Sequence, residues 1–230
     1  MSDTSLTALE YEKRYYREHV ETGTDYLVHG YWHEQYAELV VEATLQATYA
    51  RPFVVDAGCA CGSQLLGLKK TGVFARVMGV DLSKHMIKLG RKHFGYSASE
   101  LVHGSIDNLP ISSGSVSLLH SNQVLEHIPD NLTDGILDEF ARVLRPGGRV
   151  FLCLDAIRAG ETKEMYMGDP THVNIQPVLY WTSKLQSRGL LFDIEAADRF
   201  ARSKCRPTEE FAETFFEHYS SWSVWTLIKA

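Results

Sequence analysis

The sequence predicts an α/β fold in three layers, with a largely parallel β-sheet between two layers of helices. Two observations lead to this prediction. Between residues 53 and 154, short apolar runs of strand length alternate with segments of helical periodicity, and such alternation produces parallel sheets covered on both faces. The chain of 230 residues, 44% apolar and 23% charged, also has the composition of a globular domain with a large core.

Local patterns place each element of this core. A helix is expected over about residues 34–50, because Ala37, Val40, Val41 and Leu45 recur at helical spacing. Apolar runs predict the strands that follow, and periodic segments bounded by capping or turn residues predict the helices. In chain order these are a strand at 53–56, a helix at 62–70, a strand at 75–81, a helix at 83–94 that begins on the N-cap residue Ser83, strands at 101–104 and 115–121, a helix at 131–144 and a strand at 149–154.

The C-terminal part has a weaker pattern. It predicts a helix at 176–186, an extended segment at 190–198, a helix at 211–216 and a second extended segment at 221–229. Two late strands joined by a helix can extend one edge of the same sheet. We therefore expect a single domain over 1–230, with a core at 34–155, an aromatic segment at 1–33 and a substrate-side loop, helix and edge strands at 156–230.

Charge and cysteine content exclude several classes of protein. The net charge of −6 argues against nucleic-acid binding, which requires a dense basic surface. No apolar stretch reaches the length of a membrane span, and the N-terminus lacks the pattern of a secretory signal. The four cysteines do not form a disulfide framework, so a cytoplasmic protein without membrane partners is expected. The sequence leaves monomer and homodimer open.

The most informative segment is 53–62, where a strand ends at Asp56 and a turn containing Gly58 and Gly62 opens a helix. Such a turn cradles a cofactor, because small residues let the backbone approach the ligand and the helix start offers unpaired N–H groups. A nicotinamide site requires G-x-G-x-x-G, and here the last glycine comes one residue too early. A carboxylate at the strand end would repel a pyrophosphate but suits the ammonium group of S-adenosylmethionine.

Two further acids end the next two strands. Asp81 follows Asp56 by 25 residues, at a place where an acid can accept hydrogen bonds from both ribose hydroxyls. Its structural alternative is to cap the helix that follows. After the third strand, Ile106 can cover an adenine face while Asp107 accepts from its exocyclic amine. The alternative for Asp107 is a turn residue before Pro110.

With these motifs the chain resembles the class I S-adenosylmethionine-dependent methyltransferases. The similar segments follow the family's order over roughly residues 35 to 155; they are VVDAGCACG (54–62), VMGVDLS (77–83), GSIDNLP (104–110), SNQVLEHIP (121–129) and LRPGGRVFL (144–152). The resemblance implies a three-layer, Rossmann-like sandwich whose seven-stranded, mostly parallel sheet has an antiparallel edge strand.

The resemblance also implies S-adenosylmethionine as the cofactor and assigns residues to it. Asp56 orders the turn and attracts the amino group, while the turn residues let the backbone reach the methionine part; they are Gly58, Cys59, Ala60 and Gly62. The other implied contacts are Asp81 at the ribose, Leu82 beside the adenine, Ser105, Ile106 and Asp107 around the adenine, and Asn122 or Gln123 beneath the reacting methyl. Alanine stands at position 60 where the family usually has glycine, and its Cβ disfavours positive φ.

Two histidines are candidates for catalysis. His127 follows the fourth strand and His172 lies in the polar loop after the fifth, and ligands of α/β sheets bind outside the carboxyl ends of the strands. Each histidine can act as a base or only anchor its loop. Cys59 and Cys61 lack a second ligand pair, so we expect small turn residues there and no metal site.

The aromatic N-terminal segment is a candidate lid. Tyr11, Tyr15 and Tyr31 would line the pocket and exclude water from a reactive sulfonium, with ordinary core packing as the alternative.

The predicted function is methyl transfer from S-adenosylmethionine to an O or N nucleophile of a small-molecule acceptor, by in-line displacement. The alternatives are a peptide or protein acceptor, or a protein that binds S-adenosylmethionine without catalysis.

Overall fold

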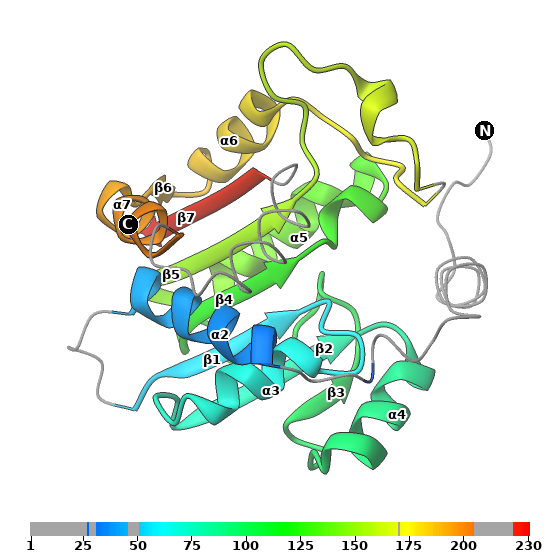
Figure 1. The fold of residues 1–230 in the computed structure, drawn as a ribbon, viewed down its shortest axis with the longest axis vertical. Helices are drawn as coiled ribbons and strands as arrows, with labels where there is room; N and C mark the ends of the chain where they lie inside the picture. The colour runs from blue at the N-terminus through cyan, green and yellow to red at the C-terminus, as the bar shows by residue number, and fades with distance from the viewer. Residues whose placement is uncertain (1–26, 28–30, 46–50, 170, 205–222) are drawn as a thin grey trace.

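The computed structural model describes residues 27, 31–45, 51–169, 171–204 and 223–230 (Figure 1). Its strands are β1 (Phe53–Ala57), β2 (Arg76–Asp81), β3 (Leu101–His103), β4 (Val116–Asn122), β5 (Leu144–Leu154), β6 (Leu190–Phe192) and β7 (Ser223–Lys229). Its helices are α2 (Tyr31–Thr44), α3 (Ser63–Lys70), α4 (Lys84–Phe94), α5 (Asp130–Val143), α6 (Val178–Gln186) and α7 (Ile194–Lys204), with the short 3-10 helices η3 (Leu125–His127) and η4 (Lys163–Tyr166).

The described strands form one seven-stranded sheet in the order β3-β2-β1-β4-β5-β7-β6. Neighbours from β3 to β5 run parallel, whereas β7 runs antiparallel to both β5 and β6. The predicted mostly parallel sheet with an antiparallel edge is thereby confirmed; the antiparallel strand is β7, which lies next to the edge strand β6. The strand order reverses between β1 and β4, and in open α/β sheets ligands bind at such a reversal, outside the carboxyl ends of the strands.

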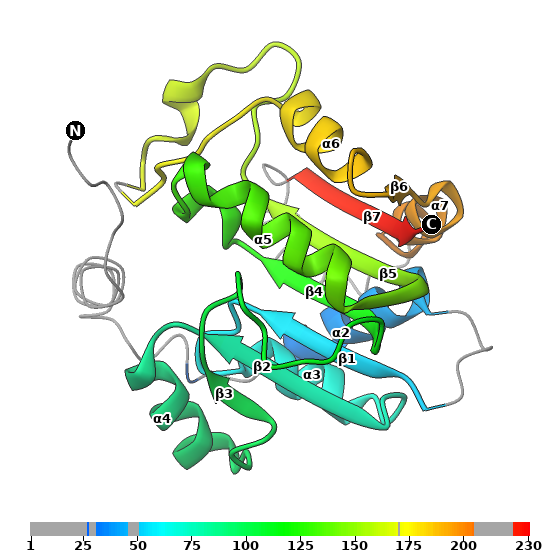
Figure 2. The same ribbon diagram turned by 180° about the vertical axis from the view of Figure 1, so that it is seen from behind.

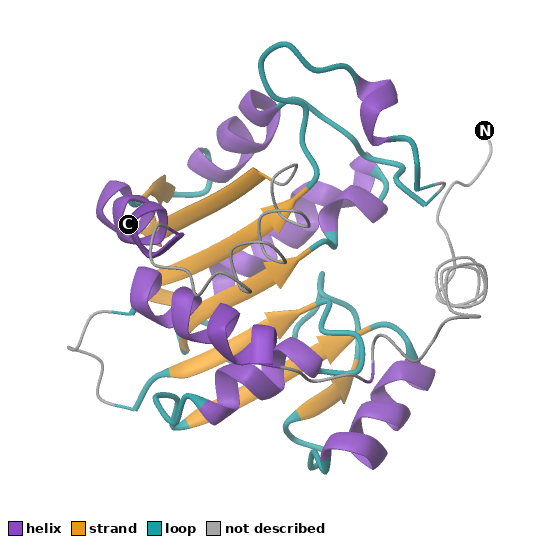
Figure 3. Ribbon diagram, viewed as in Figure 1, coloured by secondary structure: helices purple, strands orange, loops and turns teal. Residues whose placement is uncertain are grey.

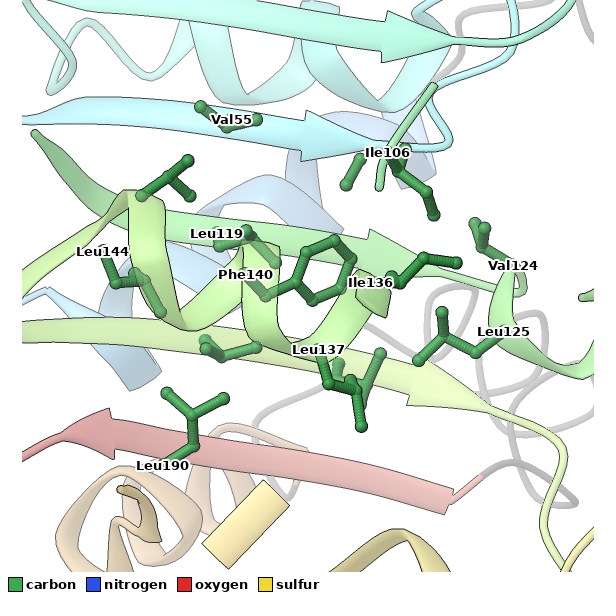
Figure 4. Packing of buried hydrophobic residues seen from close by; sticks show 14 of the residues in the cluster. Val55, Ile106, Leu119, Val124, Leu125, Ile136, Leu137, Phe140, Leu144 and Leu190 are labelled. Atoms are coloured by element: carbon green, nitrogen blue, oxygen red, sulfur yellow. The ribbon is translucent and has the colours of Figure 1, made fainter. Parts of the chain in front are cut away.

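Helices cover both faces of the sheet (Figure 2, Figure 3). Alternate residues of β1 enter different cores: Val55 packs with residues of α5 and α6, and Val54 packs with residues of α2, α3 and α7. Figure 4 shows the first core, where Phe140 of α5 lies over Leu119 of β4. Burial on both faces is the pattern expected of a central parallel sheet.

Most predicted boundaries agree with the structure to within one or two residues, and three do not. α2 extends over Tyr31–Thr44 rather than 34–50. β5 begins at Leu144 rather than 149, because Leu144 already pairs with Val116 before the register shifts at the Pro-Gly-Gly turn.

The prediction of an extended segment at 190–198 is correct for β6 (Leu190–Phe192) and wrong for the residues after it. Asp193 caps a helix there, since its Oδ1 accepts from the Ala196 N–H at 3.0 Å, and α7 follows. The Asp193 side chain is held in place by Arg149 of β5 at 2.9 Å. The helix predicted at 211–216 lies outside the described residues. Within the described part of the chain, no helix is both long and apolar enough to cross a membrane.

Candidate functional site

The turn after β1 contains three residues in the left-handed region of φ, and backbone hydrogen bonds hold it in place. Gly58, Ala60 and Gly62 have φ values of +80°, +48° and +83°. The Gly58 N–H donates to the carbonyl of Val80 at 2.9 Å, which ties the turn to β2. A Cβ on Gly58 would lie 2.4 Å from Cγ2 of Val124, so a side chain at this position would force Val124 to shift. The alanine at position 60 does occupy a conformation that glycine adopts at lower cost.

Asp81, at the end of β2, is the carboxylate that organises this turn. Its Oδ2 accepts from the Ala60 N–H and its Oδ1 from the Ser83 N–H, both at 2.8 Å. The side chain is 6% exposed. Burial raises the pKa of Asp81 to about 6, although the two amide hydrogen bonds act in the opposite direction. The carboxylate therefore bridges the first turn and the start of α4. Leu82, next to it, is half-buried.

Asp56 points into the core, where its carboxylate contacts a histidine. Its Oδ1 lies 2.7 Å from Nδ1 of His120 on β4, and Nε2 of the same ring lies 2.8 Å from the hydroxyl of Tyr36 on α2. The three residues are 2%, 0% and 1% exposed. The sequence motifs predict a ligand contact for Asp56 and no role for His120 or Tyr36. No local signal could have found them, because His120 stands opposite Asp56 only in the parallel pairing of β1 with β4 that the structure shows.

The residues predicted around the adenine follow β3. Ile106 is buried and belongs to the core beneath α5, Ser105 is half-buried, and Asp107 is exposed. Across the strand reversal, Asn122 is the last residue of β4 and Gln123 follows it. The Oδ1 of Asn122 and the Nε2 of Gln123 are buried and have no hydrogen-bond partner within the described residues. Gln123 also has a positive φ of +54°. Buried polar atoms left unpaired in this way point to a missing ligand.

The two predicted histidines meet beyond the ends of β4 and β5. Their ring centroids are 4.9 Å apart. His127 contacts the hydroxyl of Thr171 through Nδ1 at 2.9 Å, and His172 contacts the carbonyl of Tyr166 through Nδ1 at 2.8 Å. The pair lies between η3 and the loop that follows β5, so tertiary folding joins two sequence motifs 45 residues apart.

Glu126 completes this group, although the sequence motifs predict no role for it. It is 0% exposed, and its Oε2 has no hydrogen-bond partner among the described residues. Burial raises the pKa of Glu126 to about 8. A pocket of about 270 Å³ opens beside the group, lined by eight residues that include Asp155, Arg158, Asp169 and His172. The side chain of Glu126 stands in SNQVLEHIP, where its burial could not be inferred from the sequence.

Of the remaining predicted residues, the two cysteines are packed in the turn, and the three tyrosines lie wholly or partly outside the described residues. Cys59 and Cys61 are buried, and a Cβ on Gly79 would lie 2.6 Å from Sγ of Cys59, which shows close packing in the turn. Burial raises the pKa of Cys61 to about 11. Tyr11 and Tyr15 lie outside the described residues. Tyr31 is the first residue of α2, and its side chain lies outside them too.

Comparisons with known proteins agree on the class of fold. Residues 55–152 match the family described as "Methyltransferase domain". Demethylmenaquinone methyltransferase of Bacillus velezensis is 34% identical over 105 residues, which are 44% of this chain and 44% of that protein. The chain thus spans less than half the length of this curated relative.

Solved structures are similar over most of the chain. Geranyl diphosphate C-methyltransferase of Streptomyces coelicolor, solved with S-adenosyl-L-homocysteine, has a TM-score of 0.62 at 18% identity and covers 85% of this chain and 75% of its own. Haemonchus contortus phosphoethanolamine N-methyltransferase 2, solved with S-adenosyl-L-methionine, has a TM-score of 0.64 at 15% identity and covers 100% of this chain and 61% of its own. Residues 55–152 thus match the methyltransferase-domain family, and the chain shares its fold with these two methyltransferases.

Proposed function

We propose that this chain transfers a methyl group from S-adenosylmethionine to an O or N nucleophile of a small-molecule acceptor. The observation that carries the proposal is the juxtaposition of two features at the strand ends: unpaired polar atoms on Asn122 and Gln123, and a polar pocket lined by His172. One side offers contacts to a cofactor, and the other offers room for an acceptor.

The residues present fit the cofactor. Gly58 and Gly62 adopt positive φ values, and this turn at the carboxyl end of β1 would present its backbone to the methionine part. Asp81 would accept from the ribose hydroxyls, and Ile106 with Asp107 would hold the adenine. Asn122 and Gln123 would satisfy their unpaired atoms on the methionine part. When bound, S-adenosylmethionine supplies an electrophilic methyl on a sulfonium, which a nucleophile takes by in-line displacement.

The acceptor pocket supports a small polar substrate. Its volume of about 270 Å³ lies near the lower end of small-molecule sites. Arg158 and several carboxylates line it, so it can hold hydrogen-bonding groups of either sign. His172 lines the pocket directly, while His127 is 3% exposed. His172 is thereby the better placed of the two to assist removal of an acceptor proton, and His127 to orient the loop through Thr171.

Two measurements test this function. Calorimetry with S-adenosylmethionine and separately with NADH checks the cofactor, and only the first should bind. Formation of S-adenosylhomocysteine with a panel of hydroxyl- and amine-bearing metabolites, followed by a mass shift of one methyl, checks the acceptor. Turnover of peptides alone would replace the small-molecule proposal. Binding without turnover of any acceptor class would favour a non-catalytic role.

A further inference from the structure

We propose that Glu126, His127 and His172 form a binding site for one divalent transition-metal cation of the Zn²⁺ type at the inner end of the acceptor pocket. One ligand atom from each of the three side chains lies within 4.8 Å of the others. Carboxylate and imidazole ligands around a cation are about 3–3.5 Å apart at usual bond lengths of ~2.1 Å, so a modest contraction closes the site. This departs from the sequence-based expectation of no metal, which considered only the cysteines.

The tautomers of both rings are fixed in the form that a metal requires. A carbonyl oxygen only accepts, so Nδ1 of His172 carries the proton that it donates to Tyr166. The Thr171 hydroxyl donates to Asp169 at 2.5 Å and must therefore accept from Nδ1 of His127. In the neutral form of each ring the lone pair then lies on Nε2, and the Nε2 of His172 lies 3.8 Å from Oδ2 of Asp169. Metal-binding histidines are held in this way through their other nitrogen.

Glu126 supplies an independent sign of a missing ligand. It is fully buried, yet its Oε2 has no partner in the described part of the chain, while its Oε1 accepts from the Asp155 N–H at a long 3.4 Å. The Oδ1 of Asp155, a residue 8% exposed, is unpartnered in the same sense. Buried carboxylate oxygens without donors are costly, and a cation bound by Glu126 removes that cost.

The ligand set selects the class of cation. Two imidazoles and one carboxylate suit Zn²⁺ and its neighbours, whereas Mg²⁺ and Ca²⁺ prefer oxygen ligands only. Three protein ligands leave a coordination position open, and the pocket beside His172 gives access to it. The site would thus have the composition of a catalytic centre.

If the proposed methyl transfer is correct, an open coordination position facing the pocket favours acceptors that can bind a metal cation. This step rests on the proposed function. The acceptor would bind the cation through the heteroatom X of an X–H group, and the cation would lower the pKa of that group. The proton leaves to water in the pocket, and the lone pair on X forms the bond to the methyl carbon. The electron pair of the breaking carbon–sulfur bond stays on sulfur. His172 then acts as a ligand rather than as the proton acceptor.

Cobalt titration of the chelator-treated full chain tests the site, with Co²⁺ alone as the probe. We expect one equivalent to bind with visible d–d absorption, without a thiolate charge-transfer band, and to be displaced by Zn²⁺. Glu126→Gln and His172→Ala should abolish this absorption, while Thr171→Val should weaken binding about 10- to 100-fold by removing the partner of His127. His93→Ala, on the exposed part of α4, is the matched control and should bind Co²⁺ as the parent does.

The outcomes separate the metal site from the proposed function. Absence of a 1:1 cobalt complex, or a complex unchanged by Glu126→Gln and His172→Ala, overturns the metal site. Calorimetry with S-adenosylmethionine on the metal-free chain then reports on the cofactor independently of this result. Unfolding temperatures of the variants within a few degrees of the parent show that any loss of cobalt binding is local.

Discussion

Asp81 allows the sharpest test of how this turn works, because its carboxylate has two opposite effects. Burying its charge destabilises the fold, whereas the hydrogen bonds that it accepts stabilise the turn and, as proposed, the bound cofactor. The two amide hydrogen bonds at 2.8 Å show that it organises the turn, and its proposed partner is a ribose. We consider Asp81→Asn, which preserves the shape of the side chain but removes the charge. The variant keeps one oxygen for one of the two amides and turns an NH₂ group toward the other.

The structure sets the magnitudes. A rise in pKa from 3.8 to about 6 means that ionised Asp81 costs the folded chain about 3 kcal/mol. This cost is fully present above pH 6 and disappears as the pH falls through 6 toward the unfolded value. Asp81→Asn removes the cost but leaves one buried amide unsatisfied, at about 1–3 kcal/mol. The free energy of unfolding near pH 8 should therefore change by less than about 2 kcal/mol.

Cofactor binding should respond differently from stability. Loss of the charged acceptor should weaken S-adenosylmethionine binding by about 1–3 kcal/mol, or about 5- to 150-fold in Kd. Since the ribose hydroxyls need the ionised form, the parent's affinity should fall about tenfold between about pH 8 and pH 5, and that of Asp81→Asn should not.

Calorimetry at the two pH values and thermal unfolding of both proteins provide the measurements. Asp138→Asn, at an exposed position of α5, is the control for removal of a surface acid. An Asp81→Asn variant that binds S-adenosylmethionine as tightly as the parent at about pH 8 would refute the ribose role. A parallel pH dependence in both proteins would show that another group controls binding.

Three further predictions follow from burial in the same region. His120→Phe leaves the Asp56 carboxylate buried without its partner, and the free energy of unfolding in denaturant should fall by about 3–5 kcal/mol; a loss below about 1 kcal/mol contradicts the role of this pair. Gly58→Ala places a Cβ 2.4 Å from Val124 at a φ of +80°, and should destabilise by about 2–4 kcal/mol, with partial recovery in the double variant with Val124→Ala. Failure of recovery would mean that backbone strain rather than the clash dominates. Cys61, with a pKa of about 11, should resist iodoacetamide near pH 8 in the folded chain and react once unfolded, as peptide mass mapping can show.

Several parts of the fold were predictable because they depend on local pattern. The strand before Gly58 and the helix after Ser83 are set by apolar runs, a left-handed turn and an N-cap, all of which are short-range. The end of β6 was missed although Asp193 is a good N-cap. Its side chain is fixed by Arg149 from a strand 44 residues earlier, so the boundary depends on a long-range contact.

By itself, the sequence determined the fold class and the resemblance to methyltransferases, because the motif that turns the chain at Gly58 and the acid at Asp81 are local and ordered along the chain. Only the tertiary structure decided where each side chain points. It directed Asp56 into the core toward His120, and it brought Glu126 and His127 against His172. The physical reason is that burial and charge pairing are properties of neighbours in space, and parallel strands join residues that the sequence keeps far apart.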